Sequence, residues 1–427
     1  MAELQDRIVP MKIVVRAASP AYDSYCYGRR RAIPLGSRAV KQRKEWHRAL
    51  VRGAPGARGP AAAALAAGLS PTPGHDLVYH GGKLLPDLTY MNVFLGGSSA
   101  WNASDRRNIN GGLAAAMKDR GLNNVLVQYF RGGAVTTTVA KPLVLKGTLP
   151  DPIGPAFLKN AVRSLFEQGR VPVTEPASTI VNFLLPPGAI LRLPESGDEA
   201  RRDDDDDDDD DDNDNGRGGR GGRRLIGGEG AAEPDRPRIG GEGAGPDRKA
   251  DSLNGLGGFH GSVHIPSGTG ASTTVYYSTG VFSDDLPNGG QNGIVVFDEP
   301  WKNVVATFYH ELCEARTDPD VDDVIATQNV SLWGWADGDG NEIGDFPIFE
   351  AGNDLSLVFQ EVPLANGSGS VPIQLEYSNF VHGPEGPAPT ARPFSKLAAP
   401  GVSAASGPPA ARRSAPRKAR ATARSRR

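Results

Sequence analysis

A histidine and two glutamates between Val304 and Pro319 are the side chains best suited to chemistry. His310 and Glu314 are four residues apart, so in a helix their side chains project from the same face, one turn from each other. The pattern His-Glu-x-x-Glu is a variant of the zinc-hydrolase pattern His-Glu-x-x-His. It predicts that His310 and Glu314 bind zinc and that Glu311 is the general base on a metal-bound water.

An amphipathic helix over residues 301–316 would position these side chains. At about 100° per residue, one apolar stripe contains Trp301, Val304, Val305, Phe308, Leu312 and Ala315, and the opposite side contains Asn303, Thr307, His310 and Glu314. Pro319 cannot continue the helix, and it disfavours the helical conformation of Asp318. A surface helix that carries these residues by chance explains the five-residue pattern equally well, because any surface helix has an apolar stripe.

A metal site needs at least a third protein ligand, and the sequence offers several. Asp320 lies ten residues after His310, where an extended zinc motif places its third ligand. Glu342 and Asp345 follow about thirty residues later, where a zincin supplies a ligand from a later segment. We favour Glu342, with Asp345 as an alternative ligand or as a hydrogen-bond partner of His310.

Three further histidines, His260, His264 and His382, are candidates for contact with substrate or metal. His260 and His264 flank a Gly-Ser pair that we interpret as a turn, and ordinary histidines at strand ends explain them as well. The run from Asp337 to Asp345 resembles part of a calcium loop, but it lacks the glycine and the closing glutamate at the expected offsets. A solvated turn is the alternative explanation of that run.

Composition divides the 427-residue chain into one folded part and three low-complexity segments. Gly (54) and Pro (35) are abundant, and ten consecutive aspartates occupy positions 203–212. We predict a basic, disordered leader over residues 1–82, a disordered Asp/Gly/Arg-rich insert over 193–256 and a disordered basic tail over 383–427. A calcium-attracting tract is the alternative for the aspartates. Residues 83–192 and 257–382 would then form the two halves of a single domain.

Within these halves, hydrophobic periodicity predicts strands alternating with helices at first and mostly strands later. The predicted strands cover residues 88–95, 124–130, 136–145, 178–185, 275–278, 293–297, 355–362 and 372–377, and the predicted helices cover 105–120, 155–168 and 301–316. This order predicts an α+β domain with a mixed sheet packed by helices.

Several protein classes are excluded or disfavoured by simple counts. The two cysteines, Cys26 and Cys313, exclude a disulfide framework, and we expect Cys313 to be a buried structural thiol. The sequence has no apolar run of about 18 residues, so we expect no membrane-spanning helix. No signal peptide is recognisable, so a cytoplasmic location is the default expectation. The basic tail lacks an aromatic-basic platform, so we do not expect nucleic-acid binding. The oligomeric state is not indicated.

The segment His310-Glu-Leu-Cys-Glu-Ala-Arg-Thr-Asp-Pro319, with Gly334-Trp335 and Glu342-Ile-Gly-Asp345 after it, resembles a known pattern. It is similar to the His-Glu-Leu-x-Glu-Ala-x-Thr-Asp-Pro helix of the EXORDIUM-like (phosphate-induced protein 1) group and its bacterial relatives. Gly258-Phe-His260 resembles the Gly-aromatic-His stretch before that helix, and residues 89–130 match in layout. The resemblance implies a zincin-like domain with a metal site at His310, Glu314 and a later acid, and with Glu311 as base.

The expected function is therefore a zinc-dependent, peptidase-like hydrolase that acts on an unidentified peptide or wall-type substrate. The alternative is a non-catalytic, zincin-fold binding or structural protein of the EXORDIUM-like type. The chain departs from the group in its lack of a signal peptide, although the resemblance implies secretion, and in its aspartate-rich insert. It also departs at Arg316, which we expect to add a cation beside the metal-binding face.

Overall fold

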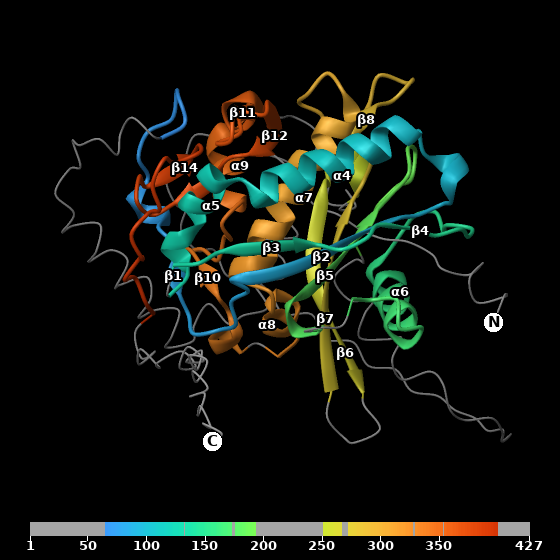
Figure 1. Ribbon diagram of the computed structural model, residues 1–427, viewed down its shortest axis with the longest axis horizontal. Helices are drawn as coiled ribbons and strands as arrows, with labels where there is room; N and C mark the ends of the chain where they lie inside the picture. The colour runs from blue at the N-terminus through green and yellow to red at the C-terminus, as the bar shows by residue number, and fades with distance from the viewer. Residues whose placement is uncertain are drawn as a thin grey trace, which may run out of the picture.

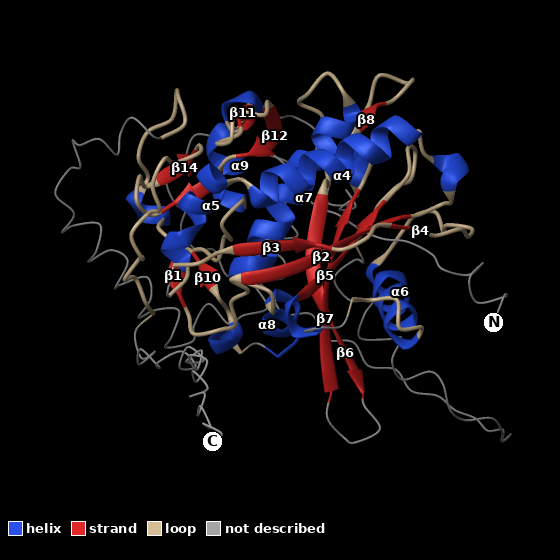
Figure 2. Ribbon diagram, in the orientation of Figure 1, coloured by secondary structure: helices blue, strands red, loops and turns tan. Residues whose placement is uncertain are grey.

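The computed structural model describes residues 65–399 apart from positions 132, 173–175, 194–250, 267–271, 328 and 353. The aspartate tract, residues 1–64 of the leader and residues 400–427 of the tail lie outside the described residues, as do the disorder and calcium expectations placed on them. The described part contains helices and a mixed β-sheet, as an α+β fold requires (Figure 2).

The central sheet brings together strands from both predicted halves of the domain. Its order is β3 (Thr136–Val139), β2 (Asp87–Phe94), β5 (Thr179–Leu184), β7 (Ser272–Gly280) and β6 (Gly258–Pro266), and β4 (Leu143–Val144) also pairs with β2. All pairs are parallel except β6 with β7. The antiparallel strand β6 therefore forms one edge of the sheet.

The helices cover both faces of this sheet. The described helices are α4 (Ala103–Lys118), α5 (Arg120–Leu126), α6 (Pro155–Glu167), α7 (Pro300–Thr317), α8 (Val321–Thr327) and α9 (Asp345–Ala351). The connection through α4 carries the chain from β2 to β3, and the connection through α6 returns it in the opposite direction to β5. Right-handed crossovers in opposite directions place their helices on opposite faces. Figure 1 shows α6 across the sheet from α4 and α7.

Short two-stranded ribbons extend the fold beyond the sheet. They pair β1 (Val78–Tyr79) with β10 (Trp335–Ala336), β8 (Asp284–Asp285) with β9 (Gln291–Asn292), β11 (Phe359–Pro363) with β12 (Ser370–Gln374), and β13 (Glu376–Ser378) with β14 (Gly383–Glu385). Strand β12 packs against α7, which also contacts α4, β6 and β7. Helix α7 therefore lies between the sheet and the C-terminal ribbons.

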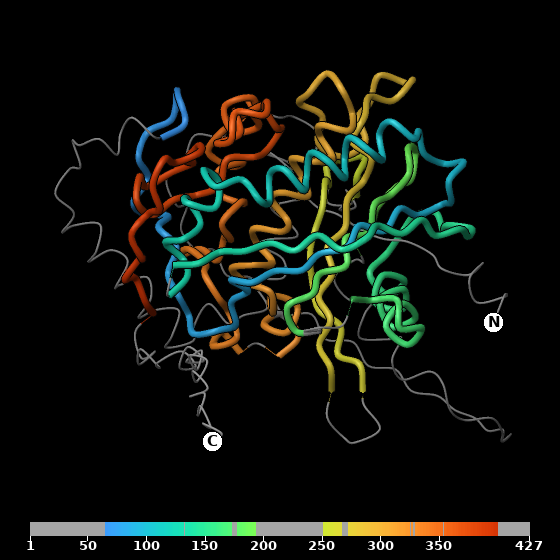
Figure 3. Tube along the Cα trace, viewed as in Figure 1, coloured from blue at the N-terminus to red at the C-terminus, as the bar shows by residue number. Residues whose placement is uncertain are grey.

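The ordered part is longer at both ends than the sequence predicted, and the last residues of the predicted insert, 251–256, include the 3-10 helix Ser252–Asn254 and the buried Leu256. Residues 65–82, assigned to the disordered leader, include β1 and the fully buried Leu77. Residues 383–399, assigned to the tail, include β14. The two segments bridge each other at Leu65 and Glu385 and at Tyr79 and Ala398, and they lie side by side in Figure 3. Their composition resembles that of a linker, but backbone hydrogen bonds join the two segments, as from the Tyr79 amide to the Leu397 carbonyl oxygen (3.3 Å).

Two predicted strands are wrong. Residues 124–130 form the end of α5 and a 3-10 turn, because Asp119 caps the helix by accepting a hydrogen bond from the Leu122 amide (3.0 Å). Residues 293–297 lie outside the strands, because the amides of Val296 and Phe297 donate to the side chain of Asn303 instead of to a neighbouring strand. The first part of the predicted strand 355–362 is also a 3-10 turn.

A buried row of polar side chains crosses the sheet on the face that carries His260. Asn92, Asn182 and Ser278 are direct neighbours on β2, β5 and β7, and His260 continues the row on β6. Ser278 Oγ donates to Asn182 Oδ1 (2.8 Å), and Asn182 Nδ2 donates to Asn92 Oδ1 (2.9 Å). Because directly opposite residues point to the same face, the row fixes the side of the sheet on which His260 lies.

We expect Asn182→Ala to lower the free energy of unfolding by about 2–3 kcal/mol, because it removes two buried hydrogen bonds and strands the Asn92 carbonyl oxygen. Urea denaturation measures this difference. Asn160→Ala, at an exposed position of α6, is the matched control. Equal stability of the two variants would contradict a structural role for the row.

Candidate metal centre

The polar side of α7 faces the protein interior. Asn303, Thr307, His310 and Glu314 are all buried, as are the apolar residues on the other side of the helix from Val304 to Ala315. The explanation by a surface helix is therefore wrong for α7. Strand β12 and the segment around Glu342 and Asp345 cover the polar side of the helix. Buried His and Glu side chains at this density need partners, because burying unpaired charge costs free energy.

The ring of His310 is held in one orientation by a glutamine from β12. Gln374 Nε2 donates to the Gly344 carbonyl oxygen (2.6 Å), so its Oε1 is left to accept a hydrogen bond from His310 Nδ1 (2.9 Å). The proton on Nδ1 is therefore fixed, and Nε2 faces Glu314 Oε2 at 3.2 Å. Ligands of a tetrahedral zinc with bonds of about 2.0 Å lie roughly 3.3 Å apart. The pair has the spacing of two ligands of one ion.

His260, the third residue of β6, lies against the same group of carboxylates. Its Nε2 is 3.0 Å from the Asp318 carbonyl oxygen, which can only accept a hydrogen bond, so Nε2 carries a proton. Its Nδ1 lies 3.5 Å from Glu311 Oε2 and 3.8 Å from Glu314 Oε2. The predicted Gly-Ser turn is wrong, because residues 258–266 form one continuous strand.

Without a metal, protons on the two histidine rings offset part of the negative charge of the carboxylates. Burial lowers the pKa of His310, but the carboxylates of Glu314 and Glu311 raise it to about 10. Burial likewise lowers the pKa of His260, and Glu311 and Glu314 raise it to about 9. Burial raises the pKa of Glu311 to about 7. Both rings are therefore protonated at neutral pH, and a bound metal would displace one proton from each ring that it uses.

Glu342 reaches the centre from the turn before α9, and Asp345 reaches it as the first residue of that helix. Asp345 Oδ2 accepts a hydrogen bond from the Glu342 amide (2.9 Å), which fixes the turn. Asp345 groups with His310 and Glu314, whereas Glu342 groups with His260 and Glu314, and the ligand atoms within each group lie within 4.8 Å of one another. His310 bonds to Gln374, so the expectation that Asp345 is its hydrogen-bond partner is wrong.

The other predicted residues lie elsewhere. Asp320 Oδ1 accepts a hydrogen bond from the Tyr276 hydroxyl (2.7 Å). His264 is half exposed and pairs with Asp323 (2.7 Å), and His382 pairs with Asp76 (2.9 Å). None of the three joins a described metal-ligand group.

Arg316 does not add a cation beside the centre. It is fully buried, and its guanidinium donates to the carbonyl oxygens of Pro86 and Thr136 and to the Thr137 hydroxyl. These acceptors belong to the segments of β2 and β3, so the cation stabilises the packing of α7 on that edge of the sheet.

The aspartate run forms a turn in which Asp337 is buried and Asp339 is exposed, and the calcium expectation for it stays a prediction. Asp337 is fully buried, and its carboxylate accepts hydrogen bonds from the amides of Asp339 and Asn341, from the Asn341 side chain and from His75. These bonds occupy the oxygens that a cation would need, although His75, Asp337 and Asp339 lie close together. Asp337 therefore organises the turn that leads to Glu342.

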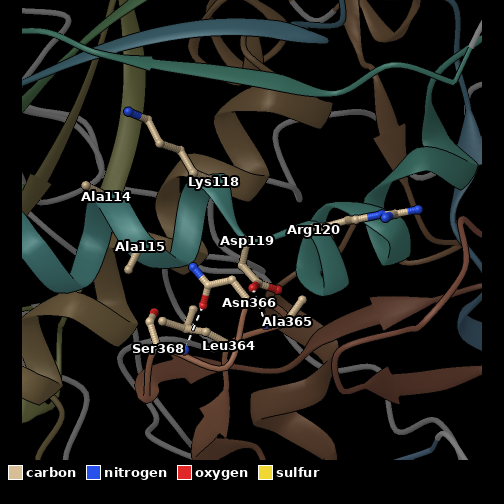
Figure 4. Close-up of a pocket in the computed structure, with 9 residues that line it drawn as sticks. All are labelled: Ala114, Ala115, Lys118, Asp119, Arg120, Leu364, Ala365, Asn366 and Ser368. Carbon is tan, nitrogen blue, oxygen red and sulfur yellow. Dashed lines mark hydrogen bonds between the residues drawn. The ribbon is translucent and has the colours of Figure 1, made fainter.

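A shallow pocket of about 480 Å³ lies away from the centre, between the end of α4 and the loop Leu364–Ser368 (Figure 4). Both oxygens of Asp119 accept backbone hydrogen bonds, from Leu122 and Ala365. The side chains of Lys118 and Arg120 diverge in Figure 4. The pocket therefore lacks a converging set of polar groups.

Sequence reasoning missed the residues that orient the centre. Gln374 and the Asp318 carbonyl hold the two rings, and Glu376 is a further buried carboxyl whose pKa responds to His310. Only the Asp-Pro pair at 318–319, which ends α7 and exposes the Asp318 carbonyl to His260, gave a signal in the sequence.

Comparison with known proteins gives no relatives: no family model, no curated protein and no solved structure matches the chain. The resemblance to the EXORDIUM-like group stays a prediction. None of the helices in the described ranges combines the length and apolar character that crossing a membrane requires.

Proposed function

We propose that the chain is a divalent-metal-dependent hydrolase, peptidase-like and zincin-like, with zinc as the first candidate ion. The supporting observation is the His310–Glu314 pair at 3.2 Å, with the other nitrogen of His310 fixed by Gln374. Histidines that bind metals commonly donate their second N–H to such an acceptor. Asp345 is the best third ligand, because it groups with His310 and Glu314.

In the proposed reaction, Glu311 transfers the proton and His260 orients Glu311. A bound zinc ion lowers the pKa of a coordinated water to about 7. Glu311, next to His310 on α7, accepts the proton of the attacking water and passes it to the leaving amine. His260 Nδ1, 3.5 Å from Glu311 Oε2, orients that carboxylate.

The second candidate function is a binding or structural protein whose metal only stabilises the fold. The burial of the centre favours it: the exposed fractions are 2% for His310, 0% for Glu311, 4% for Glu314 and 8% for Asp345. Structural zinc sites are closed to solvent, whereas catalytic sites keep an open position. The two functions differ in what Glu311 does.

The test is metal content by mass spectrometry, combined with turnover on a peptide library. We expect bound zinc in the wild-type protein. His310→Ala should hold about one zinc fewer per chain, because it removes one of the few protein ligands of the ion. Glu311→Gln should keep the ion that His310 binds and lose turnover by about 10²- to 10⁴-fold.

His264→Ala is the matched control, because His264 is an exposed histidine that is outside the centre. Protein prepared without chelator that holds no transition metal would exclude the proposed function. Full turnover in Glu311→Gln would exclude the role of Glu311 as base. Bound zinc without turnover in any variant would favour the structural function.

A further inference from the structure

Glu314 belongs to two groups of possible metal ligands. One group contains His310, Glu314 and Asp345, and the other contains His260, Glu314 and Glu342. In each group the ligand atoms lie within 4.8 Å of one another, and Glu314 is the residue that the groups share. Each group has one imidazole and two carboxylates, so each could hold an ion of its own.

The ring of His260 is prepared for an ion in the same way as that of His310. One nitrogen of each ring is committed to an oxygen acceptor, the Asp318 carbonyl for His260 and the Gln374 amide for His310. The other nitrogen of each ring faces Glu314 Oε2, at 3.8 Å for His260 and 3.2 Å for His310. Glu342 Oε1 lies on the other side of the His260 ring, 3.5 Å from Nε2. The two rings therefore approach one carboxylate from different elements, β6 and α7.

The charge of the centre exceeds what one ion can compensate. Six buried carboxylates lie around the two rings: Glu311, Glu314, Asp318, Glu342, Asp345 and Glu376. With neutral rings and all six carboxylates ionised, one divalent cation leaves four negative charges, and a second cation leaves two. The Arg316 guanidinium bonds to the Pro86 and Thr136 carbonyls instead. Buried charge without compensation costs several kcal/mol per ion.

Unsatisfied oxygens point to the same conclusion independently. Glu311 is fully buried, and neither of its oxygens has a hydrogen-bond partner among the described residues; the same holds for Glu314 Oε1. Glu311 Oε2 is aimed at His260 Nδ1, 3.5 Å away. Buried carboxylate oxygens without donors are rare in proteins, and a bound ion is one of the few ways to satisfy them.

We propose that the centre binds two divalent cations, with Glu314 as the bridging carboxylate. The first ion is the one proposed above for His310, Glu314 and Asp345, so this inference rests on the proposed function. The second ion is held by His260, Glu314 and Glu342. Its ligand set, one imidazole and two carboxylates, suits a first-row cation such as Mn²⁺ or Zn²⁺.

The experiment measures the metal content of the full chain after dialysis against Mn²⁺ or Zn²⁺ alone. Wild type is expected to hold about two ions per chain, as two-metal sites do. His260→Ala and the volume-conserving Glu342→Gln are expected to lose about one ion, and Glu314→Gln is expected to lose both. His264→Ala, on the same strand as His260, is expected to keep both. Circular dichroism of each variant shows whether it is folded.

The outcomes separate the two proposals. About one ion per chain, lost in His310→Ala and kept in His260→Ala, would overturn the second ion and leave the proposed function intact. Two ions that both persist in folded His260→Ala and Glu342→Gln would also overturn the second ligand set. No bound ion in wild type would overturn the proposed function itself.

Discussion

Replacing Gly344 with alanine is expected to weaken metal binding about 10- to 100-fold and to lower the free energy of unfolding by about 1–3 kcal/mol. A Cβ at this position would lie 2.2 Å from His310 Nδ1 and 2.9 Å from its Cγ. The ring would have to move, and its hydrogen bond to Gln374 would be lost. Because that bond fixes the ring, Nε2 would no longer keep its 3.2 Å separation from Glu314.

The Gly344→Ala substitution would also disturb the backbone hydrogen bond that Gly344 makes. The Gly344 carbonyl accepts the Gln374 Nε2–H, so displacement of the turn also releases the acceptor that orients the glutamine. The turn carries Glu342 and Asp345, both members of the ligand groups. A single methyl group therefore perturbs ligands from α7 and from the turn together.

Isothermal titration with Zn²⁺ and urea denaturation of the metal-free protein measure the two effects separately. Gly386→Ala is the matched control, because a Cβ there meets no atom within 4 Å. Unchanged affinity together with lowered stability would show that His310 packs against Gly344 without binding the ion. Unchanged values of both quantities would contradict the close approach itself.

The helix and its three reactive residues were predictable because the information is local. His310, Glu311 and Glu314 lie within five residues. In a helix, His310 and Glu314 project from one face and Glu311 projects from the adjacent side. The same local reasoning located β2, β5, α4 and α6 to within a few residues of their observed bounds. It failed at residues 124–130, where an apolar run fits a strand and a buried helix equally well.

The partners of the helix were not predictable, because they depend on which elements lie side by side. His260 reaches Glu311 only because β6 turns back antiparallel to β7 at the sheet edge. Gln374 reaches His310 from 64 residues away, and glutamine at a strand end carries no distinctive signal. The burial of the polar side of α7 has the same origin, since the ribbons that cover it follow the helix in the chain.

The metal-free protein is expected to lose stability as the pH rises from about 5 to about 8, and Glu376→Gln is expected to remove a large part of that loss. Burial raises the pKa of Glu376 from 4.5 to about 8, because neither carboxylate oxygen has a hydrogen-bond donor among the described residues. His310 opposes this increase, whereas Glu314, Glu311 and Asp345 reinforce it.

The sign follows from proton linkage. Between pH 4.5 and about 8, the folded state holds a proton on Glu376 that the unfolded chain has released. Stability from this group is therefore complete below pH 4.5 and falls as the pH rises through the folded-state pKa. At about pH 7 the loss reaches up to about 3 kcal/mol, since one pKa unit corresponds to about 1.4 kcal/mol.

Urea denaturation of metal-free wild type and Glu376→Gln at about pH 5, 7 and 8 tests this expectation. Glu167→Gln, at an exposed position of α6, is the matched control and should keep the wild-type slope. A wild-type slope in Glu376→Gln would assign the pH dependence to the other buried groups with raised pKa values, which are Glu311 and Asp318 at about 7, His260 at about 9 and His310 at about 10. A smaller slope would show that the folded, metal-free protein keeps Glu376 protonated, and therefore uncharged, at neutral pH.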